Sequence, residues 1–226
     1  MYLSSKNMKP EIDWSTINTI LLDMDGTLLD LYFDNYFWQQ YLPEQWGKLN
    51  GLGAEQARNQ LKAWYEKEAG TLSWYCLDFW TERLKFDVFA LKADVEHLIK
   101  IRPTAEIFLQ KLSVSDYSVV MVTNAHEKLV DMKMQKTGIN VFFDQIISAH
   151  RIGHAKEEQS FWQKLQAEIA FIPEQTLLID DNLTVLRAAK QFGIKNLLSI
   201  AKPDSQNPEQ DTQEFRAIHS FEDLVF

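Results

Sequence analysis

The stretch Thr19-Ile-Leu-Leu-Asp-Met-Asp-Gly-Thr27 decides the fold of this chain. Its apolar start is typical of a short strand that is buried on both faces. Two carboxylates follow the strand at Asp23 and Asp25, and Gly26 allows the chain to turn there. Such a turn brings both acids into one crevice, where one can attack an electrophile while the other transfers a proton. The pattern alone leaves a calcium loop or a plain capping turn open.

Further apolar runs along the chain predict a sheet. Residues 118–123, 145–148, 175–179 and 196–200 have the pattern of four more strands. Helical patterns cover residues 104–112, 127–136, 157–170 and 183–192, and the first of these is expected to bury Ile107, Phe108 and Leu112. Strands that alternate with helices indicate an α/β fold, with a Rossmann-like parallel sheet covered by helices on both faces. Ligands bind such sheets at the carboxyl ends of the strands.

The segment 31–100 interrupts this alternation. Apolar stripes at helical spacing cover residues 57–65, 74–84 and 91–99, and 15 of the 28 aromatic residues lie in this segment. We therefore expect an α-helical subdomain at 31–100, inserted into a catalytic core made of residues 1–30 and 101–226. Residues 202–213 are expected to form a surface loop, and residues 217–226 a short docking helix.

Composition excludes several classes of protein. A chain of 226 residues suits one large domain or a core with one inserted subdomain. The formal net charge of −9 argues against a nucleic-acid polymer as partner, although a small phosphorylated substrate stays open. A single cysteine excludes an intramolecular disulfide and, judged from the sequence, a cysteine-based zinc site. No apolar run is long enough to span a membrane and residues 1–9 are polar, so we expect a cytoplasmic protein.

Polar residues gather at the ends of three predicted strands or loops. Thr123 and Asn124 follow one strand, Asp180 and Asp181 follow another, and Lys156 precedes a predicted helix. Each of them has an ordinary structural role when taken alone: a helix cap, a solvated surface lysine or an N-cap acid. Together with the two acids of the first strand they provide a nucleophile, a cation and oxygen ligands for Mg²⁺.

In this order and context the motifs resemble those of the haloacid dehalogenase-like (HAD) phosphohydrolase superfamily. The resemblance implies that Asp23 is a nucleophile that forms an aspartyl-phosphate, and that Asp25 protonates the leaving alcohol and later activates water. It also implies that Thr123, Asn124 and Lys156 hold the phosphoryl group, with Lys156 stabilising the nucleophile as well. The implied cofactor is Mg²⁺. Its implied ligands are Asp23, the backbone carbonyl of Asp25, Asp181 directly, and Asp180 directly or through water.

The sequence departs from the superfamily pattern at the last motif. Many relatives have Gly-Asp there and a further acid four residues later, whereas this chain has two adjacent acids and Val185. The choice of direct metal ligand between Asp180 and Asp181 is therefore open. Asp25 disfavours a haloacid dehalogenase, and the filled motif positions argue against a non-catalytic binding protein. A phosphomutase stays open, because it uses the same parts.

The resemblance places a helical cap at residues 31–100, which would close over the site and select the leaving group. Residues 29–38, 73–80, 123–126 and 179–181 further resemble the bacterial GMP/IMP nucleotidase branch. That branch implies a 5′-nucleotidase for purine nucleoside monophosphates, and a sugar-phosphate or phosphoglycolate phosphatase is the alternative. The candidate substrate contacts in the cap are Asp34, Asn35, Trp74 and Tyr75. Four further residues near the motif loops are expected to have surface or capping roles: His126, His150, Arg151 and His154.

Overall fold

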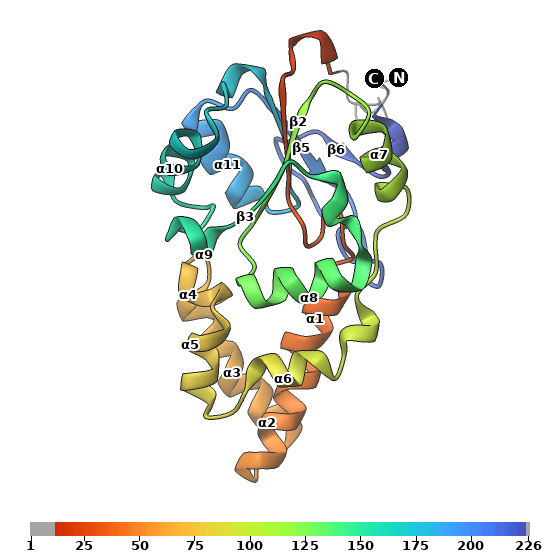
Figure 1. Cartoon of the computed structure of the whole chain (residues 1–226). Helices are drawn as coiled ribbons and strands as arrows, with labels where there is room; N and C mark the ends of the chain where they lie inside the picture. The colour runs from red at the N-terminus through yellow and green to blue at the C-terminus, as the bar shows by residue number, and fades with distance from the viewer. Residues whose placement is uncertain (1–11, 225–226) are drawn as a thin grey trace, which may run out of the picture.

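The computed structural model describes residues 12–224, so the expectation about residues 1–9 concerns a part outside the described range. Six strands form one sheet in the order β3-β2-β1-β4-β5-β6, and every neighbouring pair is parallel. Figure 1 shows this sheet in the upper part of the molecule. The strands are β1 (Thr19–Leu22), β2 (Ser118–Thr123), β3 (Gln145–Ser148), β4 (Thr176–Ile179), β5 (Asn196–Ile200) and β6 (Ala217–Ile218). The predicted α/β fold with a parallel, Rossmann-like sheet is confirmed.

Strand β1 lies inside the sheet between β2 and β4, and its four residues are all buried, as the apolar run predicts. Leu22 pairs with Met121 of β2 on one side and with Ile179 of β4 on the other. The chain therefore leaves β1 at Asp23 directly beside the point where it leaves β4 at Asp180. This register brings the acids of two distant motifs to one edge of the sheet.

Helices cover both faces of the sheet (Figure 1). Alternate strand residues divide between two apolar clusters, so that Leu22 packs with α7 (Ala105–Leu112) and α8 (Glu127–Thr137). Leu21 belongs to the cluster formed with α9 (Ala149–Ile152), α10 (Gln159–Ile169) and α11 (Leu183–Phe192). One expected core residue is wrong: Ile107 is 56% exposed, because α7 turns Leu109 inward instead. Helix α10 begins at Gln159, two residues later than predicted, since Glu158 has extended backbone angles.

The segment 31–100 is helical in the structure and lies below the sheet in Figure 1. Its elements are α1 (Tyr32–Tyr36), a π-helical turn (Phe37–Tyr41), α2 (Leu42–Asn50), α3 (Ala54–Glu68), α4 (Leu72–Tyr75), α5 (Leu77–Leu84), α6 (Val88–Ala93) and a 3-10 turn (Glu96–Leu98). The stripe at 74–84 is therefore not one helix. Cys76 breaks it with extended backbone angles, and its sulfur caps α5 by accepting from the Phe79 N–H.

The C-terminal segment differs from the expected docking helix. Ala217 and Ile218 add β6 beside Ser199 and Ile200, and a 3-10 turn (Phe221–Asp223) follows, while residues 225–226 lie outside the described range. Ser220 caps the start of that turn through a reciprocal capping box with Asp223. Residues 202–213 form a loop as expected. Among the described helices, none combines the length and apolar character that crossing a bilayer requires.

Candidate active site

Three carboxylates converge at the carboxyl edge of the sheet. Carboxylate oxygens of Asp23, Asp180 and Asp181 lie within 4.8 Å of one another. Asp23 is 5% and Asp180 1% exposed, so little water screens their mutual repulsion. Burial is the main cause that raises the pKa of Asp23 to about 6, and it also raises the pKa values of Asp180 and Asp181.

Lys156 supplies the positive charge closest to this group. Its Nζ atom donates to Asp23 Oδ1 at 2.6 Å, to Asp180 Oδ2 at 2.7 Å and to the Val122 carbonyl at 3.0 Å. The side chain is 2% exposed, and the two carboxylates raise the pKa of the ammonium against the opposing effect of burial. A single lysine therefore holds the acids of β1 and β4 together, and one ammonium cannot neutralise three carboxylates.

The residues present fit a hard divalent cation such as Mg²⁺. Asp23 Oδ2 is buried and has no hydrogen-bond partner within the described residues. The Asp181 carboxylate lies against Gly26, where a Cβ atom would come within 2.4 Å of Asp181 Oδ2. Gly26 has φ +85, so its lack of a side chain serves both the turn and the close approach. Clustered carboxylate oxygens are the donors that Mg²⁺ prefers.

Asp25 belongs to a second buried charge network that the sequence did not suggest. Lys133 of α8 donates to Asp25 Oδ1 at 2.7 Å and to Asp34 Oδ2 at 2.7 Å. Lys92 of α6 donates to Asp34 Oδ1 at 2.5 Å, and its ammonium also lies 4.6 Å from the centre of the Phe37 ring. Acids and lysines therefore alternate along a chain that runs from the sheet into the helical segment.

The two acids of this network have opposite pKa shifts. Burial, together with the nearby Asp34 carboxylate, raises the pKa of Asp25 to about 6 against the effect of Lys133. Burial also opposes ionisation of Asp34, but Lys133 and Lys92 outweigh it and hold its pKa below the usual range. Asp34 is thus a fixed anion, while Asp25 titrates near neutral pH. An acid with such a pKa can both donate and accept a proton.

Thr123 and Asn124 lie at the end of β2 as predicted, but their side chains have partners inside the protein. Thr123 Oγ1 accepts from the Ala125 N–H at 3.1 Å. Asn124 accepts from the Lys156 N–H at 2.9 Å and donates to Glu157 Oε2 at 2.9 Å. Asn124 therefore positions the segment that carries Lys156. Its predicted contact with phosphate, like that of Thr123, stays a prediction.

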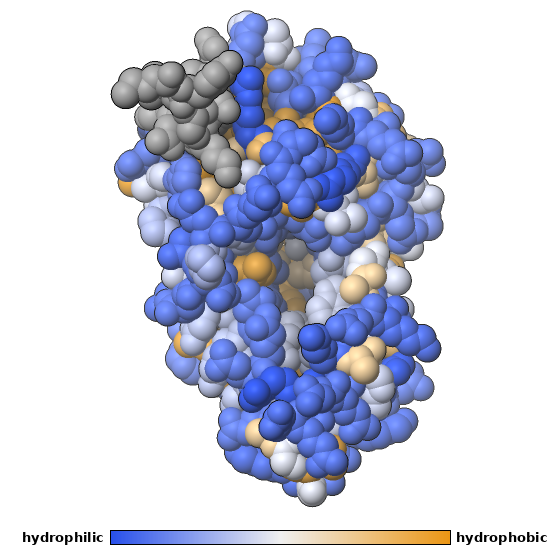
Figure 2. All heavy atoms as spheres, turned by 180° about the vertical axis from the view of Figure 1, so that it is seen from behind, coloured by the Kyte–Doolittle hydropathy of each residue, from blue (hydrophilic) through white to orange (hydrophobic). Residues whose placement is uncertain are grey.

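A cavity of about 540 Å³ connects the acids to the helical segment. The four candidate residues of that segment all line it: Asp34, Asn35, Trp74 and Tyr75. Figure 2 shows the surface hollowed at the level where the upper and lower parts of the molecule meet. Several of these side chains also bond to the protein, since Tyr75 Oη donates to Glu157 Oε1 at 2.6 Å and Asn35 donates to Asp204 Oδ2 at 2.7 Å. Their contact with substrate stays a prediction.

Trp74 faces the cavity from an aromatic cluster. Its ring centre lies 5.6 Å from that of Trp38 and 5.2 Å from that of Tyr65, and both of these residues also line the cavity. Trp80 is fully buried behind them and donates from its indole nitrogen to the Trp74 carbonyl at 2.8 Å. The aromatic side chains therefore build the core of the helical segment and one wall of the cavity together.

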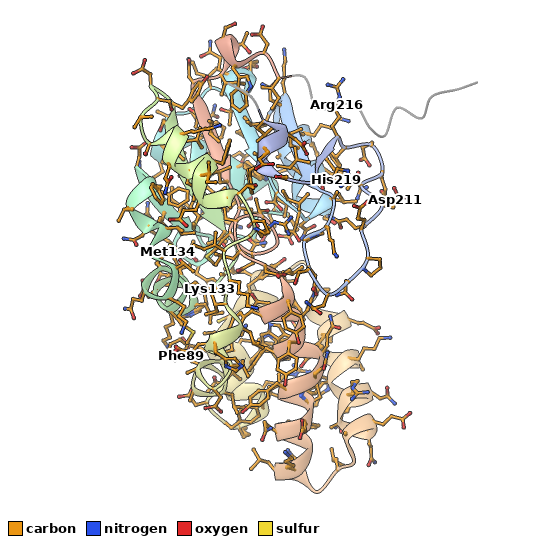
Figure 3. The ribbon with its side chains drawn as sticks, turned by 90° about the vertical axis from the view of Figure 1, so that its right-hand side faces the viewer. Phe89, Lys133, Met134, Asp211, Arg216 and His219 are labelled. Atoms are coloured by element: carbon orange, nitrogen blue, oxygen red, sulfur yellow. The ribbon has the colours of Figure 1, made fainter. Side chains whose placement is uncertain are left out.

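Three residues of this site, from α8, α6 and the 202–213 loop, were not predicted from the sequence to lie there. Lys133 follows buried Leu129 by one helical turn, so a lysine on the apolar face of α8 was the available signal. Figure 3 labels Lys133 where the sheet-bearing part meets the helical segment. Lys92 gives the same signal, since it follows buried Val88 by one helical turn, whereas Gln210 had none. Gln210, from the 202–213 loop, donates to the backbone carbonyls of Asp181 at 3.0 Å and Ile200 at 2.9 Å.

Comparisons with known proteins agree with this arrangement. Residues 17–193 match the family model of haloacid dehalogenase-like hydrolases. The chain is 38% identical over 218 residues to the GMP/IMP nucleotidase YrfG of Escherichia coli (strain K12), a match that covers 96% of this chain and 98% of that protein. It is 25% identical to the pyrophosphatase PpaX of Anoxybacillus flavithermus (strain DSM 21510 / WK1), over 79% of this chain and 81% of that protein.

Solved structures show the same fold at low sequence identity. A HAD phosphatase from Thermococcus onnurineus matches with a TM-score of 0.74 and 18% identity, covering 91% of this chain and 95% of that chain. The HAD-hydrolase YfnB from Bacillus subtilis matches with a TM-score of 0.63 and 19% identity, covering 91% and 96%. The matched family model and the 38% identity to a relative over nearly the whole chain agree with the strand-end acids and the buried lysine. The chain therefore belongs to the haloacid dehalogenase-like hydrolases.

Proposed function

We propose that this hydrolase is a Mg²⁺-dependent 5′-nucleotidase that removes phosphate from purine nucleoside monophosphates such as GMP and IMP. The chemistry is carried by one observation: Asp23 presents a buried oxygen without a hydrogen-bond partner among the described residues, at the end of the cavity where Lys156 holds its other oxygen. The substrate class rests on the 38% identity to a GMP/IMP nucleotidase, which extends through the cavity wall of residues 31–100.

In the proposed reaction Asp23 Oδ2 attacks phosphorus and the ester P–O bond breaks. Asp25 gives its proton to the leaving ribose oxygen, and the phosphoryl group stays on Asp23 as an aspartyl-phosphate. Asp25, now ionised, then takes a proton from the water that attacks phosphorus, and Asp23 and inorganic phosphate are released. The pKa of about 6 supports both roles of Asp25 near neutral pH.

The proposed metal ligands are Asp23, Asp181 and the backbone carbonyl of Asp25. Asp180 accepts from Lys156 and from the Asn182 N–H at 2.9 Å, so its oxygens already have partners and a role through water suits it better. Mg²⁺ held by these residues would neutralise charge on the phosphoryl oxygens and on the clustered carboxylates. Lys156 would add a second positive charge beside Asp23.

We further propose that residues 31–100 act as a cap over a core of residues 1–30 and 101–226. The chain passes between the two parts at Leu29, which bridges Ile101. The cavity lies between the strand ends and the aromatic wall, so a base that enters it meets Trp74 and Tyr65. Stacking of a base on an aromatic ring contributes about 1–3 kcal/mol, which favours a nucleotide over a small sugar phosphate.

The test is phosphate release from GMP, IMP, CMP, glucose 6-phosphate and phosphoglycolate, each with Mg²⁺ and with a chelator. Asp23→Asn is expected to abolish turnover while the exposed Asp116→Asn control keeps it. Preference for GMP and IMP, lost in chelator, supports the proposal. Activity on the sugar phosphate or phosphoglycolate with none on the purine nucleotides would overturn the substrate class, and full activity in chelator would overturn the metal.

A further inference from the structure

A second cluster of metal-binding side chains joins the helical segment to the sheet-bearing part. Cys76 lies between α4 and α5, His126 precedes α8, and His150 lies in α9. One ligand atom from each residue lies within 4.8 Å of the others, and Figure 1 shows α9 directly above α4. We propose that Cys76, His126 and His150 bind a thiophilic transition-metal cation such as Zn²⁺, at a site separate from the carboxylate cluster.

His150 is prepared for this role by its surroundings. Its Nε2 atom is buried and has no hydrogen-bond partner among the described residues. Burial, and then His126, lowers the pKa of His150 to about 4, so the ring is neutral and keeps a lone pair at physiological pH.

Cys76 and His126 each hold a helix end and face the same space. Cys76 Sγ accepts from the Phe79 N–H at 3.5 Å at the start of α5. His126 caps α8, as expected for a residue near a motif loop, and its ring centre lies 4.9 Å from that of His150. Because His126 Nδ1 accepts from the Lys128 N–H, the neutral ring carries its proton on Nε2, and either nitrogen can bind a cation only when Nδ1 gives up that contact. Asp78 Oδ2 lies 3.6 Å from His126 Nε2, so a carboxylate is available as a fourth ligand.

The donor set selects the class of metal. Sulfur and imidazole donors favour Zn²⁺ and similar cations over Mg²⁺, which prefers oxygen. Zinc bonds of about 2.0–2.3 Å place ligand atoms about 3.3–3.6 Å apart. The present spacing of up to 4.8 Å is wider than this by about an ångström, so the three half-buried side chains must move closer together when the cation binds. A thiolate and Asp78 balance the two charges of the cation, although Lys128 donates to Asp78 at 2.8 Å and must share it.

The sequence suggested the opposite, because a single cysteine without a second one at metal-ligand spacing is not a zinc motif. The fold supplies the two histidines from segments about 50 and 74 positions away along the chain. Occupancy would tie residues 31–100 to the loop after Thr123. We infer that the bound metal restrains the segment 31–100 and thereby slows turnover. This effect on turnover rests on the proposed function, whereas the binding of the metal does not.

Cobalt(II) provides a direct test, since thiolate ligation produces a sulfur-to-metal absorption band in the near ultraviolet. The chain has one cysteine, so such a band can come from Cys76 alone. Titration is done with Co²⁺ in excess Mg²⁺, which occupies the carboxylate cluster. We expect one equivalent to produce the band, and Zn²⁺ to displace it.

Three variants test whether the absorption band comes from this cluster. Cys76→Ser keeps an N-cap for α5 but is expected to lose the band. His150→Gln is expected to weaken Co²⁺ binding about tenfold or more. His219→Gln, in the upper part of the molecule in Figure 3, is the control and should bind as the wild type does. Wild type without the band, or Cys76→Ser with unchanged affinity, would overturn the site.

Inhibition is measured separately from binding. If the nucleotidase assay detects activity, one equivalent of Zn²⁺ is expected to slow wild type but not Cys76→Ser. Binding of Zn²⁺ without inhibition would contradict the inferred effect on turnover but not the proposed metal site. Failure of the proposed substrate leaves the cobalt titration unaffected, so the two proposals fail independently.

Discussion

Replacing Lys133 by methionine tests the buried network that joins α8 to the helical segment. The Lys133 side chain is 1% exposed and donates to both Asp25 and Asp34 at 2.7 Å. Methionine keeps most of the volume but leaves Asp25 without a cation and Asp34 with Lys92 alone. Removing one partner from a buried ion pair costs about 3–5 kcal/mol. We expect the free energy of unfolding to fall by about this amount.

Lys136→Met is the matched control, because Lys136 lies in the same helix. Its side chain is 40% exposed and its ammonium lies 3.3 Å from Glu96, so its loss is expected to cost under about 1 kcal/mol. Urea unfolding, followed by tryptophan fluorescence and by far-ultraviolet circular dichroism, measures the loss in free energy of unfolding for each of the two variants. Equal losses in the two variants would refute the reasoning, since burial would then contribute nothing.

The same change is expected to alter the pH dependence of turnover. Lys133 lowers the pKa of Asp25, so its removal leaves burial and the other acids to raise that pKa above about 6. The alkaline limb of the pH dependence of kcat/KM, above which Asp25 has lost the proton that it gives to the leaving oxygen, should move to higher pH in Lys133→Met and stay in place in Lys136→Met. Adding Asp25→Asn to Lys133→Met removes the stranded carboxylate and should recover part of the lost stability, whereas Asp34→Asn would leave the buried Lys92 without its carboxylate.

Three further predictions concern the acids and the turn. The pKa of Asp25 is about 6 in the folded state against about 3.8 in the unfolded state, so protonation of Asp25 favours the folded state. With a chelator present, the free energy of unfolding of the wild type relative to Asp25→Asn should therefore fall as the pH rises from about 4 to about 6 and stay constant above pH 6, as measured by urea unfolding midpoints. Mg²⁺ at a hundred times its dissociation constant should stabilise the wild type by about 2.7 kcal/mol, raising the melting temperature by about 5–11 °C, and Asp181→Asn should lose most of this shift. Gly26→Ala should destabilise the protein and abolish turnover, because its Cβ would come within 2.4 Å of Asp181 Oδ2. Gly51→Ala is the control, since Gly51 has φ +64 and nothing within 4 Å of an added Cβ, so this variant reports backbone strain alone. Equal losses of stability in the two variants would argue against the contact with Asp181.

Much of the sheet could be predicted from the sequence because its strands are short apolar runs buried on both faces. Strand β1 and the acids after it follow directly from residues 19–25, and five of the six strands were predicted within a residue of their bounds. Strand β6 was missed, since two residues carry no period and only the neighbouring β5 backbone selects them. The stripe at 74–84 predicted one helix, because side-chain spacing does not reveal the extended backbone of Cys76.

The convergence of Asp23 and Asp180 was expected because parallel strands end at one edge of a sheet, whereas only the resemblance to the superfamily implied that Lys156 joins them. The partners of these residues were not, and Lys133 illustrates why. A lysine in an otherwise helical pattern normally faces water, and only the approach of α1 and of the turn after β1 to α8 gives it two carboxylates and removes it from solvent. Asn124 likewise turned out to position Lys156, since its amide bonds to that backbone.

By itself, the sequence determined the order of strands and helices, the acids at the strand ends and the concentration of aromatics between residues 31 and 100. These properties depend on the local periodicity and chemistry of each segment. The tertiary structure alone decided which charges are buried and paired, which aromatic faces line the cavity, and that Cys76 meets two histidines. Burial, pKa and ligand spacing depend on atoms brought together from distant segments, and no local pattern encodes those distances.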